Sequence, residues 1–147
     1  MKRLFICCFL ILPGLCLAQD YTINFEHNAF LVKDVDKAAS FYLDILKLQE
    51  IEVPGAPETR RWFSLGGSLQ LHLIEGDNAH IVHDKSVHMA CRTSDLSALI
   101  SELRDRNYPF ESWQGEKNNF NVRADGIRQI YLQDPDGYWL EINDTPR

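Results

Sequence analysis

The chain has 147 residues, of which 45% are hydrophobic and 24% are charged, a size that suits one domain with a hydrophobic core. Its formal net charge is −6, and this acidic balance argues against a nucleic-acid partner, which needs a clustered basic surface. The mean hydropathy of −0.26 excludes a protein with several membrane spans.

Residues 1–18 are predicted to be a secretory signal peptide. Two basic residues precede the nine-residue apolar run Leu4–Leu12, and small side chains stand at Cys16 and Ala18, three and one positions before a suitable cleavage point. The run is too short to cross about 30 Å of hydrocarbon. We therefore expect a secreted or periplasmic protein whose mature form has no membrane span. The bulky Leu15 argues against lipid anchoring at Cys16.

The remaining chain, residues 19–147, is predicted to be a single domain. Its formal charge is −8, because two of the 15 basic residues lie in the signal peptide. Three of the four cysteines lie there as well, so the domain has no partner for Cys91 and no internal disulfide. The apolar neighbours of Cys91 predict a strand, and we interpret its thiol as buried and unreactive.

The motif H-x-A-x-x-x-x-D occurs twice and divides this domain into two similar halves, at about 21–76 and 85–147. In the first half the motif runs from His27 to Asp34. An apolar strand is predicted before the aspartate, and the aspartate is a suitable N-cap for a helix. The strands predicted in this half are Ile23–Val32, Gln49–Val53, Arg61–Leu65 and Leu69–Ile74.

The second half repeats this order from His88 to Asp95, 61 positions further on. The polar stretch Trp113–Asp125 is predicted to be a long loop. Each half is thus a βαβββ module of the α+β class, and a module of roughly 55 residues needs the other to bury its apolar face. The strands predicted in this half are Val87–Thr93, Phe110–Trp113, Gln129–Gln133 and Trp139–Asn143.

The repeat places candidate metal ligands at matched positions. His27 and His88 lie on the first strand of each half, and alignment of the last strands places Gln70 opposite Glu141. Two imidazoles and a carboxylate with an open position are typical ligands of a catalytic divalent metal. The alternative is that each histidine is an ordinary core or surface residue.

These motifs, together with the run Asp134-Pro135-Asp136-Gly137 ahead of Glu141, resemble the vicinal oxygen chelate superfamily. That superfamily includes glyoxalase I, bleomycin and fosfomycin resistance proteins, methylmalonyl-CoA epimerase and extradiol dioxygenases. The resemblance covers nearly all of residues 19–147. It implies two modules that form a half-closed mixed β-barrel around a divalent metal, which chelates two substrate oxygens. The implied metal is Zn, Ni, Mn or Fe, and the implied ligands are His27, His88, Glu141 and Gln70, with His72 as the alternative to Gln70.

Two departures from glyoxalase I bear on the chemistry. Glyoxalase I usually has Glu where this chain has Gln70, and an amide cannot act as a base, so Glu141 becomes the predicted catalytic base. The Arg and Asn that hold glutathione in glyoxalase I are replaced by Leu31 and Ile74, which disfavours a glutathione substrate. Arg123 is a candidate clamp for a substrate anion, and we interpret Trp139 as a wall of the substrate pocket.

The sequence therefore predicts an exported, metal-dependent lyase, isomerase or epimerase that acts on a small α-oxo or α-hydroxy compound. Three alternatives stay open: a transferase or hydrolase of the fosfomycin-resistance type, an extradiol-type dioxygenase, and a non-catalytic small-molecule binder like the bleomycin-resistance proteins. The resemblance also suggests a homodimer.

Overall fold

A computed structural model describes residues 21–146, so the predicted signal peptide lies outside the described residues. Each half has the predicted βαβββ order, and the α+β class is confirmed. The elements are β1 (His27–Val32), α1 (Val35–Asp44), β2 (Gln49–Ile51), β3 (Arg60–Gly66), β4 (Leu69–Glu75), β5 (His88–Arg92), α2 (Leu96–Asp105), β6 (Asn121–Val122), β7 (Arg128–Gln133) and β8 (Trp139–Asn143).

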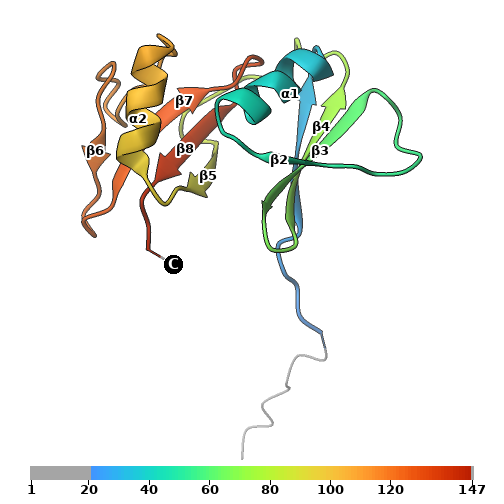
Figure 1. Cartoon of the computed structure of the whole chain (residues 1–147), viewed down its shortest axis with the longest axis horizontal. Coiled ribbons are helices and arrows are strands. Elements are labelled where there is room, and N and C mark those ends of the chain that lie inside the picture. The colour runs from blue at the N-terminus through green and yellow to red at the C-terminus, as the bar shows by residue number, and fades with distance from the viewer. Residues whose placement is uncertain (1–20, 147) are drawn as a thin grey trace, which may run out of the picture.

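The strands form two four-stranded mixed sheets with the same topology. Their orders are β1-β4-β3-β2 and β5-β8-β7-β6, and in each sheet the first strand runs parallel to the last while the other pairs are antiparallel. The two sheets lie side by side, the second half on the left in Figure 1 and the first on the right. The half-closed barrel expected from the sequence thus takes the form of two separate sheets.

Both helices begin where the sequence predicts. The carboxylates of Asp34 and Asp95 each accept a hydrogen bond of 2.9 Å from a backbone N–H in the first turn, those of Lys37 and Ala98. Each helix has ten residues, and no helix within residues 21–146 combines the length and apolarity needed to cross a membrane.

The strand predicted at Phe110–Trp113 is wrong. Only Glu111 pairs there, through isolated bridges to Tyr131 and Lys117, and β6 lies instead inside the stretch predicted as a loop. The reason is local: Pro109 has no N–H to continue the ladder, and after Glu111 the chain turns back, with Ser112 N–H donating to the Glu116 carbonyl oxygen at 3.0 Å.

The two halves share one hydrophobic core and meet at the turn of residues 134–138. There the hydroxyl of Tyr42, on α1, donates to Asp134 Oδ2 at 2.8 Å. The hydroxyl of Tyr138 accepts from the N–H of Leu31 and donates to its carbonyl, at 3.2 and 3.0 Å, so it occupies the edge of β1 as a strand would. Because β8 starts directly after this turn, these contacts fix the position of the strand that carries the candidate carboxylate.

Candidate functional site

One face of the second sheet is polar although much of it is buried. Along β7 and β8 the side chains of Gln129, Tyr131, Glu141 and Asn143 point to this face, while the residues between them contribute to the core. Sequence reasoning found only Glu141 among these four. The alternation of polar and apolar residues along both strands was the available signal for the other three.

His88 and Glu141 form the centre of this face. His88 Nε2 lies 3.4 Å from Glu141 Oε2, and its Nδ1 lies 2.8 Å from the carbonyl oxygen of Lys85. Because a carbonyl oxygen only accepts, Nδ1 carries a proton, and Nε2 is the ring nitrogen that faces the carboxylate. A hydrogen bond from Nδ1 to a backbone carbonyl, which orients Nε2 toward the site, is typical of a metal-binding histidine.

Glu141 is 6% exposed, and both of its oxygens are held by neighbours. The Tyr131 hydroxyl donates to Oε2 at 2.5 Å, and Asn143 Nδ2 donates to Oε1 at 2.8 Å. Burial and the bond to Glu141 raise the pKa of Tyr131 well above its usual value, so the hydroxyl remains a donor at neutral pH. Behind it, Gln129 Nε2 donates to the Tyr131 oxygen at 2.8 Å. These bonds offset the cost of burying the carboxylate.

Arg123 lies at the rim of this face, as a substrate clamp would require. Its Nη1 is 3.7 Å from Glu141 Oε1, and its Nε and Nη2 donate to the carboxylate of Asp125 at 3.2 and 2.5 Å. The side chain is 40% exposed. It therefore supplies a fixed positive charge beside the buried carboxylate.

Trp139 lines the same region, with a second cation above its ring. Lys85 Nζ lies 5.0 Å from the centre of the Trp139 ring and 5.8 Å from that of Tyr131, and it forms an ion pair with Glu111. Lys85 thus contributes two groups to this region: its ammonium lies over the Trp139 ring, and its backbone carbonyl orients His88. Sequence reasoning gave no role to Lys85.

The other predicted ligands lie on the first sheet. The ring of His27 stacks on that of His72 with centroids 4.2 Å apart, and His72 stacks on Trp62 at 4.3 Å. Glu26 binds His27 Nδ1, and among the described residues Nε2 of His27 has no hydrogen-bond partner. His72 Nε2 donates to the amide oxygen of Gln70 at 2.8 Å. Burial, and secondarily the neighbouring His27, lowers the pKa of His72.

The strand register differs from the alignment that the sequence suggested. Ala29 lies beside His72 across β1 and β4, and Ala90 lies beside Glu141 across β5 and β8. Ala29 and Ala90 are equivalent in the repeated motif. His72 is therefore the structural counterpart of Glu141, and the alignment of Gln70 with Glu141 is wrong by two residues.

The predicted ligands lie in two groups, one on each sheet. The described residues, 21–146, contain no group of three or more His, Cys, Asp or Glu side chains able to hold a metal, so His27 does not join His88 and Glu141 within one chain. The donor types and the orientation of His88 nevertheless fit a divalent metal, with His88 and Glu141 as two candidate ligands on one sheet. Cys91 takes no part: burial raises the pKa of its thiol to about 11, as expected of an unreactive cysteine.

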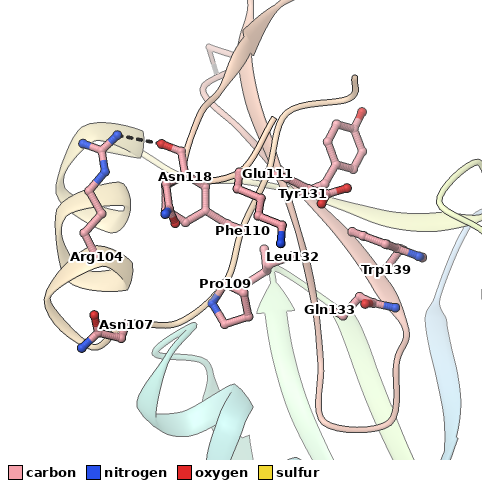
Figure 2. A pocket seen from close by; sticks show the side chains of 11 residues that line it. Arg104, Asn107, Pro109, Phe110, Glu111, Asn118, Tyr131, Leu132, Gln133 and Trp139 are labelled. Atoms are coloured by element: carbon pink, nitrogen blue, oxygen red, sulfur yellow. Dashed lines mark hydrogen bonds between the residues drawn. The ribbon is translucent and has the colours of Figure 1, made fainter. Parts of the chain in front are cut away.

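A cavity of about 480 Å³ opens beside the polar face (Figure 2). Tyr131 and Trp139 line it on one side, and Arg104 and Asn107 on the other. Its lining combines aromatic rings with charged and amide groups.

Comparisons of the sequence with known proteins identify a family and relatives. A sequence model of the Glyoxalase/Bleomycin resistance protein/Dioxygenase superfamily matches residues 24–142. The chain is 30% identical over 122 residues to the metallothiol transferase FosB of Shouchella clausii (strain KSM-K16), covering 80% of this chain and 77% of that protein. It is 25% identical over 123 residues to the uncharacterized protein YwbC of Bacillus subtilis (strain 168), covering 80% and 94%.

Solved structures share the fold. The oxidase ChaP-H2 superposes with a TM-score of 0.70 at 22% identity, over 86% of this chain and 96% of that one. The fosfomycin resistance protein FosX of Listeria monocytogenes superposes with a TM-score of 0.65 at 19% identity, also over 86% and 96%. At these identities the likeness concerns the fold alone.

Proposed function

Because the chain belongs to the Glyoxalase/Bleomycin resistance protein/Dioxygenase superfamily, we propose that it is a divalent-metal-dependent enzyme that adds a thiol or water to a small substrate bearing an oxyanion. The observation that carries this proposal is the buried Glu141, fixed at both oxygens beside His88 Nε2 with Arg123 at the rim. The 30% identity to a metallothiol transferase supports it.

The hydrogen bonds of Glu141 favour a ligand over a base. Tyr131 and Asn143 each occupy one carboxylate oxygen, which leaves fewer lone pairs to accept a substrate proton. Gln70 cannot act as a base either. Addition of a nucleophile needs no proton taken from carbon, so these residues support it better than the lyase, isomerase or epimerase reaction that the sequence first suggested.

In this proposal His88 and Glu141 hold the metal together with His27 of the partner subunit. The side chain of His27 is 43% exposed and its Nε2 has no hydrogen-bond partner among the described residues, so a second copy of the chain is a suitable source of the missing ligand. A divalent cation held there, Zn, Ni, Mn or Fe, would supply Lewis-acid stabilisation of negative charge on a substrate oxygen.

The residues of this chain account for the rest of the reaction on an epoxide such as fosfomycin. Arg123 binds the phosphonate oxygens through the donor groups that Asp125 leaves free. The nucleophile forms a bond to an epoxide carbon, and the carbon–oxygen bond breaks with its electron pair on oxygen. The nucleophile's proton ends on that oxygen, so no further reactant is needed.

Export remains part of the proposal and rests on residues 1–18, with cleavage after Ala18. Expression of the full chain with a C-terminal tag, followed by N-terminal sequencing of the tagged protein, tests it. We expect a mature chain that starts at Gln19 outside the cytoplasm; an intact Met1 in the cytoplasm would contradict export.

The function is tested by metal analysis and turnover of the purified protein. We expect the wild type to bind a divalent metal and to convert fosfomycin, with L-cysteine or water, into an adduct whose mass equals the sum of the reactants. His88→Ala and Glu141→Gln should lower metal affinity and turnover at least about 100-fold. The matched control is His80→Ala, which changes an exposed histidine outside the polar face.

Three results would contradict the proposal: a wild type that holds no divalent metal after reconstitution, ligand variants that keep full turnover, or a metal-bound wild type that forms no adduct but converts α-ketoaldehydes with thiols. The last result would restore the lyase or isomerase reaction.

A further inference from the structure

Gln129 on β7 is a buried side chain whose amide is hydrogen-bonded at only one of its two ends. It is 5% exposed, and its Nε2 donates to the Tyr131 oxygen at 2.8 Å. Its Oε1 is buried and has no hydrogen-bond partner among residues 21–146. A buried acceptor that lacks a partner lowers the free energy of unfolding, so stability alone does not explain an amide at this position.

The orientation of this amide is dictated by Tyr131. The Tyr131 hydroxyl has one proton, which it donates to Glu141 Oε2 at 2.5 Å, so toward Gln129 its oxygen can only accept. An amide turned the other way would bring two oxygen atoms together with no proton between them. Oε1 of Gln129 is therefore left without a partner because Nε2 has to face the hydroxyl.

Asn143 is oriented in a similar way on the other side of the carboxylate. It lies opposite Gln129 in the register of β7 and β8, and its Nδ2 donates to Glu141 Oε1 at 2.8 Å. Its Oδ1 accepts from the backbone N–H of Thr145 at 3.2 Å, so this amide also has a fixed orientation. Both amides thus present N–H groups toward Glu141, one directly and one through Tyr131.

We propose that Gln129 is a positioning residue that acts through Tyr131 and fixes the hydroxyl proton on Glu141 Oε2. The inference rests on the proposed function and deepens it, because Oε2 is also the carboxylate oxygen that lies 3.4 Å from His88 Nε2. A donor to the hydroxyl oxygen polarises the O–H group and strengthens the hydrogen bond from that group to the carboxylate. Gln129 in this way orients the lone pairs of Glu141 that remain for a metal, and its own Oε1 stays unpaired.

A double-mutant cycle tests this role through the affinity for Zn²⁺, measured by competition with a chromogenic chelator. Gln129→Met keeps the approximate size of the side chain and removes the donor, so the affinity should fall about 3- to 10-fold. In a Tyr131→Phe background the same change should have no further effect, because no hydroxyl is left to position. Gln49→Met, at an exposed glutamine of β2, is the matched control and should keep the wild-type affinity.

Urea unfolding of the metal-free protein separates this role from a merely structural one. Because Met leaves no buried acceptor unpaired, Gln129→Met should unfold at the same urea concentration as the wild type or at a higher one. A lower midpoint, together with equal losses of Zn²⁺ affinity in both backgrounds, would show that Gln129 only supports the fold.

Proton exchange in the metal-free protein tests the hydrogen bonds without the proposed reaction. By NMR, the buried Tyr131 hydroxyl proton should exchange slowly with solvent in the wild type and at least about 10-fold faster in Gln129→Met. If this difference is found but the wild type binds no Zn²⁺, the proposed function fails while the effect of Gln129 on Tyr131 is supported. A wild type that binds Zn²⁺, with equal exchange rates and no effect of Gln129→Met on affinity, would overturn the role of Gln129 and leave the proposed function in place.

Discussion

The buried carboxylate of Glu141 is costly unless its surroundings compensate it. Tyr131 contributes the shortest of its hydrogen bonds, 2.5 Å, and is itself fixed by Gln129. Hydrogen bonds of this kind orient a ligand carboxylate and set its affinity for a metal. If Glu141 binds the proposed metal, the hydroxyl of Tyr131 should therefore affect the metal affinity, although it is not proposed as a ligand.

Replacement of Tyr131 by Phe isolates this contribution. We expect Tyr131→Phe to lower metal affinity about 10- to 100-fold, because the carboxylate loses a fixed donor. Competition with a chromogenic chelator measures the change. Tyr108→Phe removes a hydroxyl that binds only the Gln133 carbonyl and should leave the affinity unchanged. An unchanged affinity in Tyr131→Phe would show that this bond does not organise the site.

At the scale of elements, the turn before β8 depends on a buried acid. Asp134 is 5% exposed, and its Oδ1 accepts from the backbone N–H of Asp136 and of Tyr138 at 3.0 and 2.9 Å. Its Oδ2 accepts from the hydroxyl of Tyr42 on α1. Burial raises the pKa of Asp134, although the hydrogen bond from Tyr42 acts in the opposite direction.

Tyr42→Phe should therefore destabilise the protein in a pH-dependent way. Because the pKa of Asp134 is higher in the folded protein than in the unfolded chain, the free energy of unfolding falls as the pH rises through the folded-state pKa. Loss of the Tyr42 donor raises this pKa further, so the free energy of unfolding falls by more over the same pH range. We expect a loss of about 1.5–3 kcal/mol at neutral pH, where the carboxylate is charged, and a smaller loss at acidic pH.

Urea unfolding across a pH series measures this effect. Tyr108→Phe is the control, since its hydroxyl binds a neutral carbonyl and burial raises the pKa of that hydroxyl to about 12, outside the pH range used. A loss in Tyr42→Phe that does not change with pH would show that the charge of Asp134 plays no part.

Some of these elements follow from sequence and others do not. The spacing between His27 and Asp34 predicts β1 and the start of α1, because a helix cap and an apolar strand are local features. The pairing of His72 with Ala29 is not local, because it is set by parallel strands that are far apart in the sequence. The alignment of the last strands of the two halves misses it by two residues. The cavity is equally invisible in the sequence, because it depends on what the chain does after Pro109.

At the scale of the whole molecule, each chain carries two incomplete sets of candidate metal ligands. His27 lies on the first sheet, and His88 with Glu141 on the second, without forming a group of three within residues 21–146. A symmetric dimer would place the first sheet of one copy against the second sheet of the other and so form two equivalent sites. Each site would then need residues from both subunits.

Mixed dimers distinguish this arrangement from one in which a single chain rearranges to bring its own ligands together. His27→Ala and Glu141→Gln, each produced alone, should hold no metal in either design. Co-expression with two different tags allows purification of the dimer that contains one copy of each variant. If ligands are shared, one of its two sites combines the intact His27 of one subunit with the intact His88 and Glu141 of the other. Elemental analysis should then find about half the metal content of the wild-type dimer. A mixed dimer without metal would mean that all ligands come from one chain.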